Sequence, residues 1–231
     1  MRRTALVLRP EPGNLATATR LTARGVPVRR CPLFRVMPIA WAPPDPADYD
    51  SLLLTSANAV RHAGEGLGVM AELPVLAVGA ATAAAARAAG LSVAVIGNAD
   101  AAALVTMARG HGWTRPLHLA GRDRGRLPGV AAIAVYASVP MEVAAMAIDG
   151  WRDGVALLHS PRAAERFARL VDGGGLARDR IGVAALSAAV AKAAGSGWSA
   201  ALVATRPDDK SLVAAACALI DRLGAAADKR V

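Results

Sequence analysis

Cysteine and aromatic residues are scarce in this sequence. Its 231 residues include only Cys31 and Cys217, too few for a disulfide framework or a cysteine metal site. This scarcity is typical of proteins of the reducing cytoplasm, where we expect the chain to reside. Only two Phe, two Tyr and four Trp occur, widely scattered. Because sequence-tolerant binding of single-stranded nucleic acid normally uses aromatics between basic residues, we expect no nucleic-acid partner.

Long uninterrupted apolar runs are also absent. The hydrophobic fraction is 54%, but the best candidate segment, "VAAIAVYASVPMEVAAMAI", contains Pro140 and Glu142. A membrane helix needs about 20 predominantly apolar residues, so no membrane span is predicted. The first residues, "MRRTALVLRP", have too short an apolar segment and no small-residue cleavage site, and are not expected to be a signal peptide.

Basic residues, by contrast, are in excess. The formal net charge is +9 and the isoelectric point is about 10.9, which favours an acidic partner such as nucleic acid, an anionic surface or a polycarboxylate. Charge alone does not choose among these. A codon composition rich in arginine and alanine would raise the isoelectric point equally, so that explanation stays open.

Short apolar runs alternate with alanine-rich amphipathic segments, the pattern of parallel sheets covered by helices. We therefore expect an α/β fold of two similar domains, each with a parallel five-stranded sheet flanked by helices. The ten strands are expected near residues 4–8, 26–31, 51–55, 74–78, 92–96, 116–120, 131–136, 155–159, 181–186 and 200–204.

An internal repeat predicts how the two domains are connected. "LLLTSANAV" resembles "ALLHSPRAA", and "LVLRPEPGNL" resembles "LHLAGRDRGRL", in an order that makes the repeat permuted. Residues 36–138 are thus expected to form an inserted domain, while residues 1–34 and 140–231 combine into the other. Two proline-marked segments, "FRVMPIAW" and "YASVPM", would form a two-stranded connector. The gap between the domains is the expected active cleft.

The ordered set of motifs "LVLRPEPGN", "DYDSLLLTSANAVRHAG", "LAVGAATAAAARAAG", "VYASVP" and "LLHSPRAAERF" covers most of the chain and resembles the uroporphyrinogen-III synthase family. The resemblance implies two α/β domains and a two-stranded connector. It implies a lyase that cyclises hydroxymethylbilane to uroporphyrinogen III, with loss of water and inversion of ring D, for heme, siroheme or cobalamin biosynthesis. The resemblance implies that the protein uses no metal or organic cofactor and is a monomer. It leaves open a transient contact with hydroxymethylbilane synthase.

The resemblance also implies site residues. Tyr136, in the family's Y-x-x-x-P pattern, would be catalytic by assisting departure of the ring A hydroxyl, although a packed core tyrosine is the usual reading of such a position. Helix N-termini after the strands would bind the eight substrate carboxylates. The expected substrate-binding residues are Arg9, Thr55, Ser56, Ala57, Asn58, Gly79, Thr82, Gly121, Arg122, Ser160, Arg162 and Ser187.

Several of these residues have simpler interpretations. Ser56 and Asn58 could act only as helix caps, and Arg122, Arg124 and Arg126 could form a solvated basic turn, from which we select Arg122 alone. The four histidines show no metal-ligand spacing and read as ordinary surface or core residues, of which only His159 is expected near the cleft.

The chain departs from the family pattern in two places. Ser187 and Val190 stand where the family usually has a glycine and a threonine, and "GRLPGVAAI" leaves almost no room for a helix between two strands. A non-catalytic two-domain binding protein or sensor for an anionic small molecule remains the alternative. A nicotinamide-dependent enzyme is poorly supported, because no complete glycine fingerprint occurs.

Overall fold

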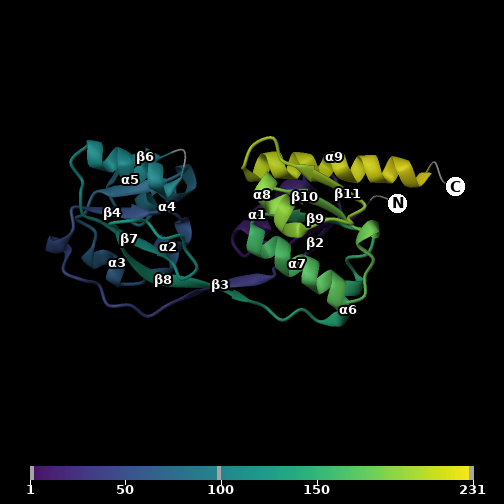
Figure 1. Cartoon of the computed structure of the whole chain (residues 1–231), viewed down its shortest axis with the longest axis horizontal. Helices are drawn as coiled ribbons and strands as arrows, with labels where there is room; N and C mark the ends of the chain where they lie inside the picture. The colour runs from purple at the N-terminus through teal and green to yellow at the C-terminus, as the bar shows by residue number, and fades with distance from the viewer. Residues whose placement is uncertain (1–2, 98–99, 229–231) are drawn as a thin grey trace. The chain divides into compact units, whose positions relative to one another are not determined.

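The computed structural model describes residues 3–97 and 100–228, and the chain divides into two compact units. Unit 1 comprises Met1–Arg35 and Pro140–Val231, and unit 2 comprises Val36–Val139. The chain passes between them through β3 (Phe34–Pro38) and β8 (Ala131–Pro140) (Figure 1).

Unit 1 contains a five-stranded parallel sheet of order β11-β10-β9-β1-β2. Its strands are β1 (Ala5–Val7), β2 (Val28–Arg30), β9 (Val155–Leu158), β10 (Gly182–Ala185) and β11 (Ala200–Val203). Its helices are α1 (Gly13–Thr22), α6 (Ala145–Asp149), α7 (Pro161–Gly173), α8 (Ala188–Ala194) and α9 (Asp209–Asp228), with a 3₁₀ turn, η2 (Arg178–Arg180).

Both faces of the unit 1 sheet are buried, because successive side chains of a strand point to opposite faces. Leu6 and Leu8 pack with α7 and α8, whereas Ala5 and Val7 pack with α1 and α9. In Figure 1, α9 and α7 lie on opposite faces of this sheet. The central strands are therefore apolar throughout, and polar side chains are confined to their ends.

Unit 2 contains a six-stranded sheet of order β3-β8-β7-β4-β5-β6. The strands not yet given are β4 (Ser51–Leu54), β5 (Val75–Val78), β6 (Val93–Gly97) and β7 (Pro116–Gly121). The helices are α2 (Ala57–His62), α3 (Gly66–Val69), α4 (Ala80–Ala88) and α5 (Ala101–Gly110), with a 3₁₀ turn, η1 (Pro46–Asp48). Leu52 and Leu54 face α2, α3 and α4, whereas Leu53 faces α5.

The expected α/β fold class is confirmed. All ten expected strands are present, and β8 continues beyond its expected end to Pro140. The difference lies in the second sheet, which has six strands and is mixed rather than parallel and five-stranded. The connector strand β3 adds to its edge beside β8, where Ile39 N donates to Val135 O at 3.0 Å.

One parallel connection in unit 2 lacks a helix, as the sequence predicts. β7 and β8 are parallel neighbours, yet the loop between them, residues 122–130, contains none. Such crossovers usually need a dozen or more residues and a helix. Leu127 and Val130 of the loop pack against the Leu53 cluster in place of a helix. No helix in the described part of the chain has the length and apolar character needed to cross a membrane.

The core of unit 1 provides a direct test of this packing. Phe167 is fully buried, and its ring centroid lies 5.2 Å from that of Trp151 and 5.4 Å from that of Trp198. We expect Phe167→Ala to lower the free energy of unfolding by about 3–5 kcal/mol, since it leaves a cavity. Urea unfolding followed by tryptophan fluorescence measures this. Met146→Ala, at a side chain 85% exposed, should change stability by less than about 0.5 kcal/mol; equal effects of both would contradict the packing.

Candidate functional site

Three serines cap helices directly after parallel strands. The Ser56 hydroxyl accepts a hydrogen bond from Asn58 N at 3.2 Å, Ser160 accepts from Ala163 N at 3.2 Å, and Ser187 accepts from Val190 N at 3.4 Å. The cap interpretation of Ser56 is therefore correct, and the structure shows the same kind of cap at Ser160 and Ser187. Because a cap satisfies only one of the four unpaired N–H groups of a helix start, the remaining groups can still bind an anion. Ser187 and Val190, the departure from the family pattern, thus form a cap of their own.

The other predicted residues of these turns in unit 2 have different surroundings. Ala57 begins α2, and the Asn58 side-chain oxygen accepts from Arg61 at 3.3 Å. Gly79 precedes α4 with a φ of 80°, a conformation that favours glycine, and its N–H donates to Gly97 O at 2.8 Å. Thr82 is only 5% exposed, so its hydroxyl presents little surface.

A cavity of about 270 Å³ lies at the carboxyl ends of β4 and β7. It brings together four predicted residues, Thr55, Ser56, Gly121 and Tyr136. The other lining residues are Ala101, His118, Asp123, Arg124, Gly125, Arg126 and Leu127. We call this cavity the tyrosine pocket. Arg122, the arginine selected from the sequence, does not line it, whereas Arg124 and Arg126 do.

His118 is a residue of the pocket that sequence reasoning missed. It is 3% exposed, and its Nε2 lies 3.0 Å from Thr55 Oγ1. Burial, and then the charge of Arg124, lowers the pKa of His118 to about 4, so the ring is neutral at neutral pH. The sequence did contain a signal for His118. Successive side chains of a strand point to opposite faces of the sheet, so position 118 of β7 points away from the face on which Leu117 and Leu119 pack.

The Tyr136 ring rests against the end of β7. A Cβ at Gly121 would lie 2.9 Å from two Tyr136 ring carbons and 3.0 Å from the phenol oxygen. Arg122 N donates to Tyr136 O at 2.8 Å, where the β7–β8 register shifts. Only glycine at position 121 leaves room for this ring position. The side chain is half-buried, packs against the unit 2 core and also lines the tyrosine pocket.

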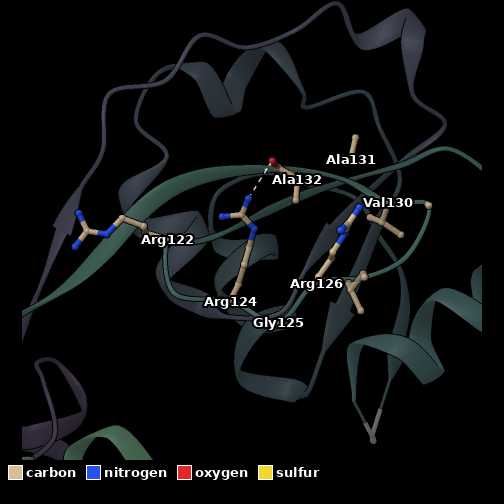
Figure 2. A pocket seen from close by; sticks show the side chains of 9 residues that line it. Arg122, Arg124, Gly125, Arg126, Val130, Ala131 and Ala132 are labelled. Carbon is tan, nitrogen blue, oxygen red and sulfur yellow. Dashed lines mark hydrogen bonds between the residues drawn. The ribbon is translucent and has the colours of Figure 1, made fainter.

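The β7–β8 loop carries Arg122, Arg124 and Arg126 (Figure 2). Arg124 is fixed by two backbone acceptors, Gly121 O and Ala132 O, each at 3.2 Å. Figure 2 shows Arg124 and Arg126 pointing the same way from the loop, while Arg122 points away from them. The basic turn is thus not uniformly solvated, since one of its side chains is anchored.

In unit 1, a single carboxylate organises the predicted residue Arg9 and three others. Asp209, at the start of α9, accepts from Thr17 Oγ1 at 2.6 Å, Arg20 Nη1 at 2.6 Å and Arg9 Nη1 at 3.1 Å. His159 Nε2 lies 2.9 Å from the same carboxylate. Arg9 is therefore held by an ion pair, and sequence spacing offered no signal of Asp209 because it lies 200 residues away.

The charges of this cluster shift two pKa values. Burial alone would raise the pKa of Asp209, but hydrogen bonds from His159 and Thr17 and the charges of His159 and Arg9 hold it well below its usual range. Burial lowers the pKa of His159 more than the Asp209 hydrogen bond raises it. At neutral pH the carboxylate is thus ionised.

Arg162 is another predicted substrate-binding residue, and it lies in the first turn of α7, after the cap Ser160. Its guanidinium carbon is 4.7 Å from the Phe34 ring centroid, a cation–π distance. The described residues include no group of three or more His, Cys, Asp or Glu side chains placed to hold a metal ion.

These features define a two-unit α/β protein whose polar and basic groups gather at the carboxyl ends of parallel strands. The chain belongs to the uroporphyrinogen-III synthase HemD family, whose model matches residues 16–214. No curated protein sequence matches significantly.

Solved structures agree on the fold. The uroporphyrinogen-III synthetase from Helicobacter pylori 26695 is similar with a TM-score of 0.65 at 13% identity, over 95% of this chain and 100% of that one. A mutant uroporphyrinogen III synthase from the extremely thermophilic bacterium Thermus thermophilus has a TM-score of 0.50 at 17% identity, over 92% of this chain and 96% of that one. At such identities the likeness shows the fold alone.

The Asp209 cluster predicts acid sensitivity. Since the folded state lowers the pKa of Asp209 from the unfolded value of about 3.9, its stabilisation is present above about pH 4 and is lost as pH falls further. We expect Asp209→Asn to lower the free energy of unfolding at pH 7 by about 1.5–3 kcal/mol. The difference from the wild type should shrink below about pH 4.

Urea unfolding at a series of pH values measures this difference. Asp149→Asn, at an exposed carboxylate of the same unit, is the matched control and should have little effect. A difference between Asp209→Asn and the wild type that stays constant from pH 7 to pH 3 would show that the Asp209 carboxylate is not the acid-sensitive group.

Proposed function

We propose that the protein converts hydroxymethylbilane to uroporphyrinogen III, with loss of water, closure of the macrocycle and inversion of ring D. The observation that carries the proposal is the tyrosine pocket. In a chain that belongs to this family, it places a phenol, a histidine-bound threonine hydroxyl and two arginines around one cavity. The proposal makes the protein a cyclising hydro-lyase of tetrapyrrole biosynthesis.

Tyr136 is the catalytic residue of the proposal. Its phenol donates a proton to the ring A hydroxyl, which leaves as water and generates an azafulvenium cation. Attack by ring D then gives a spiro intermediate that fragments and recloses with ring D inverted. Closure releases one proton, so Tyr136 can be restored without an external acid. The neutral His118 ring is not a competing cationic acid at pH 7, since its pKa is about 4.

Thr55 and His118 orient the polar wall of the pocket. The 3.0 Å contact between them fixes the Thr55 hydroxyl whichever tautomer the neutral imidazole adopts. Because His118 is buried and Thr55 follows β4, neither group needs to reorganise when the substrate binds. We assign these residues to positioning of the bilane rather than to proton transfer.

The helix starts are the proposed sites for substrate carboxylates. In unit 2 these are the turn of Ser56 with Ala57 and Asn58 and the turn of Gly79 with Thr82. Gly121 and Arg122, at the start of the helix-free β7–β8 loop, form a third proposed site. In unit 1 the corresponding groups are Arg9, Ser160, Arg162 and Ser187. Binding through several backbone N–H groups makes the catalytic effect mainly one of holding the bilane in a reactive geometry. Uncatalysed closure gives the non-inverted isomer, so this geometry decides the product.

The proposal extends to the setting of the reaction. Two free cysteines, Cys31 and Cys217, fit a reducing cytoplasm. We propose a monomer that receives its unstable bilane in a transient contact with hydroxymethylbilane synthase.

The activity is tested by generating hydroxymethylbilane in situ, adding the protein, oxidising the products and separating the uroporphyrin isomers by chromatography. We expect isomer III to predominate. Isomer I at the uncatalysed level, with protein shown by circular dichroism to be folded, would overturn the proposal and favour a non-catalytic binding protein for an anionic small molecule.

Tyr136→Phe tests the assigned proton donor in the same assay. We expect kcat to fall by about 10²-fold or more, because a general acid contributes at least that much. The chain has one other tyrosine, Tyr49, which packs against the unit 2 core and does not line the pocket. Tyr49→Phe is therefore the matched control. If both variants retain the wild-type rate, Tyr136 is not the acid.

A further inference from the structure

A second, larger cavity adjoins the tyrosine pocket at the β7–β8 loop. Its volume is about 690 Å³, within the usual range of small-molecule sites, and it shares only the loop residues 124–127 with the tyrosine pocket. We call it the arginine pocket (Figure 2). Its lining residues are Arg122, Arg124, Gly125, Arg126, Leu127, Gly129, Val130, Ala131 and Ala132.

The cavity exists because the β7–β8 connection has no helix. A crossover helix would normally cover the sheet beside β8. Here nine loop residues replace it, and the first residues of β8 are alanines, Ala131 and Ala132, whose side chains fill little space. Gly129, with a φ of 70°, turns the loop back toward β8. The opening thus follows from chain length and from small side chains.

The charge of the arginine pocket is positive and is not balanced by its own walls. Three of the nine lining residues are arginines, and none is acidic. A fourth guanidinium comes from α5, since Arg109 Nη2 lies 3.3 Å from the position that a Cβ on Gly129 would occupy. Like charges brought together from two elements repel one another, and an anion between them would relieve that repulsion.

The arginines differ in how they are held. Arg124 is anchored by the carbonyls of Gly121 and Ala132, which leaves other N–H groups of its guanidinium available. Among the residues that the structure describes, Arg126 has no hydrogen-bond acceptor or ion-pair partner. Arg124 and Arg126 point the same way in Figure 2. A fixed guanidinium beside an unpaired one suits a ligand with two or more carboxylates, since each arginine can bind one bidentately.

We propose that the arginine pocket is a binding site for a polycarboxylate, held by Arg109, Arg124 and Arg126. The site shares Arg122, Arg124 and Arg126 with the groups assigned to the substrate, so binding of a tetrapyrrole here rests on the proposed function, whereas binding of a free polycarboxylate does not. Its ligand chemistry has two sources. One is the carboxylate side chains of a tetrapyrrole, and the other is a free small polycarboxylate such as citrate.

Two probes and three single variants test the site. Uroporphyrin I, an octacarboxylate, is titrated by fluorescence, and citrate by calorimetry, against the full-length protein. We expect Arg126→Gln and Arg109→Gln each to raise the Kd of the bound probe about tenfold, the effect of losing one charge-assisted hydrogen-bonding group. Both side chains are exposed, so folding should be retained. Arg87→Gln is the control, because it removes the same charge from an exposed position of α4 outside the pocket.

The outcomes separate the two sources. Weaker uroporphyrin binding in both pocket variants, without citrate binding, assigns the site to tetrapyrrole carboxylates. Citrate binding that both variants weaken, and that competes with uroporphyrin, assigns it to a free polycarboxylate. The proposal is overturned if neither probe binds the wild type, if both variants bind like the wild type, or if Arg87→Gln weakens binding equally. The isomer assay is read separately, so failure of this site leaves the test of the synthase activity intact.

Discussion

Burial of the parallel strands on both faces is the constraint on which the rest of this structure depends. Leu6 and Val7 in unit 1, and Leu52 and Leu53 in unit 2, point to opposite faces and are all fully buried. A strand buried in this way takes a polar side chain along its length only where that side chain is hydrogen-bonded, as His118 of β7 is to Thr55. Hydroxyls, basic groups and open helix N–H groups therefore collect where the strands end. Ligand-binding chemistry in both units is confined to these ends by the packing of the core.

The β7–β8 connection shows the effect of leaving this cover incomplete. Without a helix, the loop must bury Leu127 and Val130 itself, and it leaves a cavity of about 690 Å³ beside the small residues of β8. The same loop forms a wall of the tyrosine pocket through Arg124 and Arg126. One short connection thus shapes two adjoining cavities, and Arg124, tied to both strand ends, gives the loop its fixed point.

Local pattern was enough to predict the strands and the Ser56 cap, because both depend on residues close together in the chain. Ser56 is an example, since its partner Asn58 N is two residues away. The Thr55–His118 contact and the Asp209 cluster join residues 63 and up to 200 positions apart, and their register is set by tertiary packing. The anchoring of Arg124 was equally unpredictable, since its backbone acceptors belong to β7 and β8, and the selection of Arg122 for substrate binding stays a prediction. The sixth strand of unit 2 was missed because β3 was read only as a connector.

The excess of basic residues can now be divided by what surrounds each one. Arg9 and Arg20 share Asp209, so this one carboxylate balances one of their two charges within unit 1 and holds the start of α9 beside α1. Among the described residues, Arg124 donates to two carbonyl oxygens and to no carboxylate, and Arg126 lines a cavity whose lining residues carry no carboxylate. A net charge of +9 does not by itself indicate where an anion binds. The position of arginines that have no carboxylate partner within the protein is a better indicator of an anion site, because their charge is balanced by solvent ions or by a ligand.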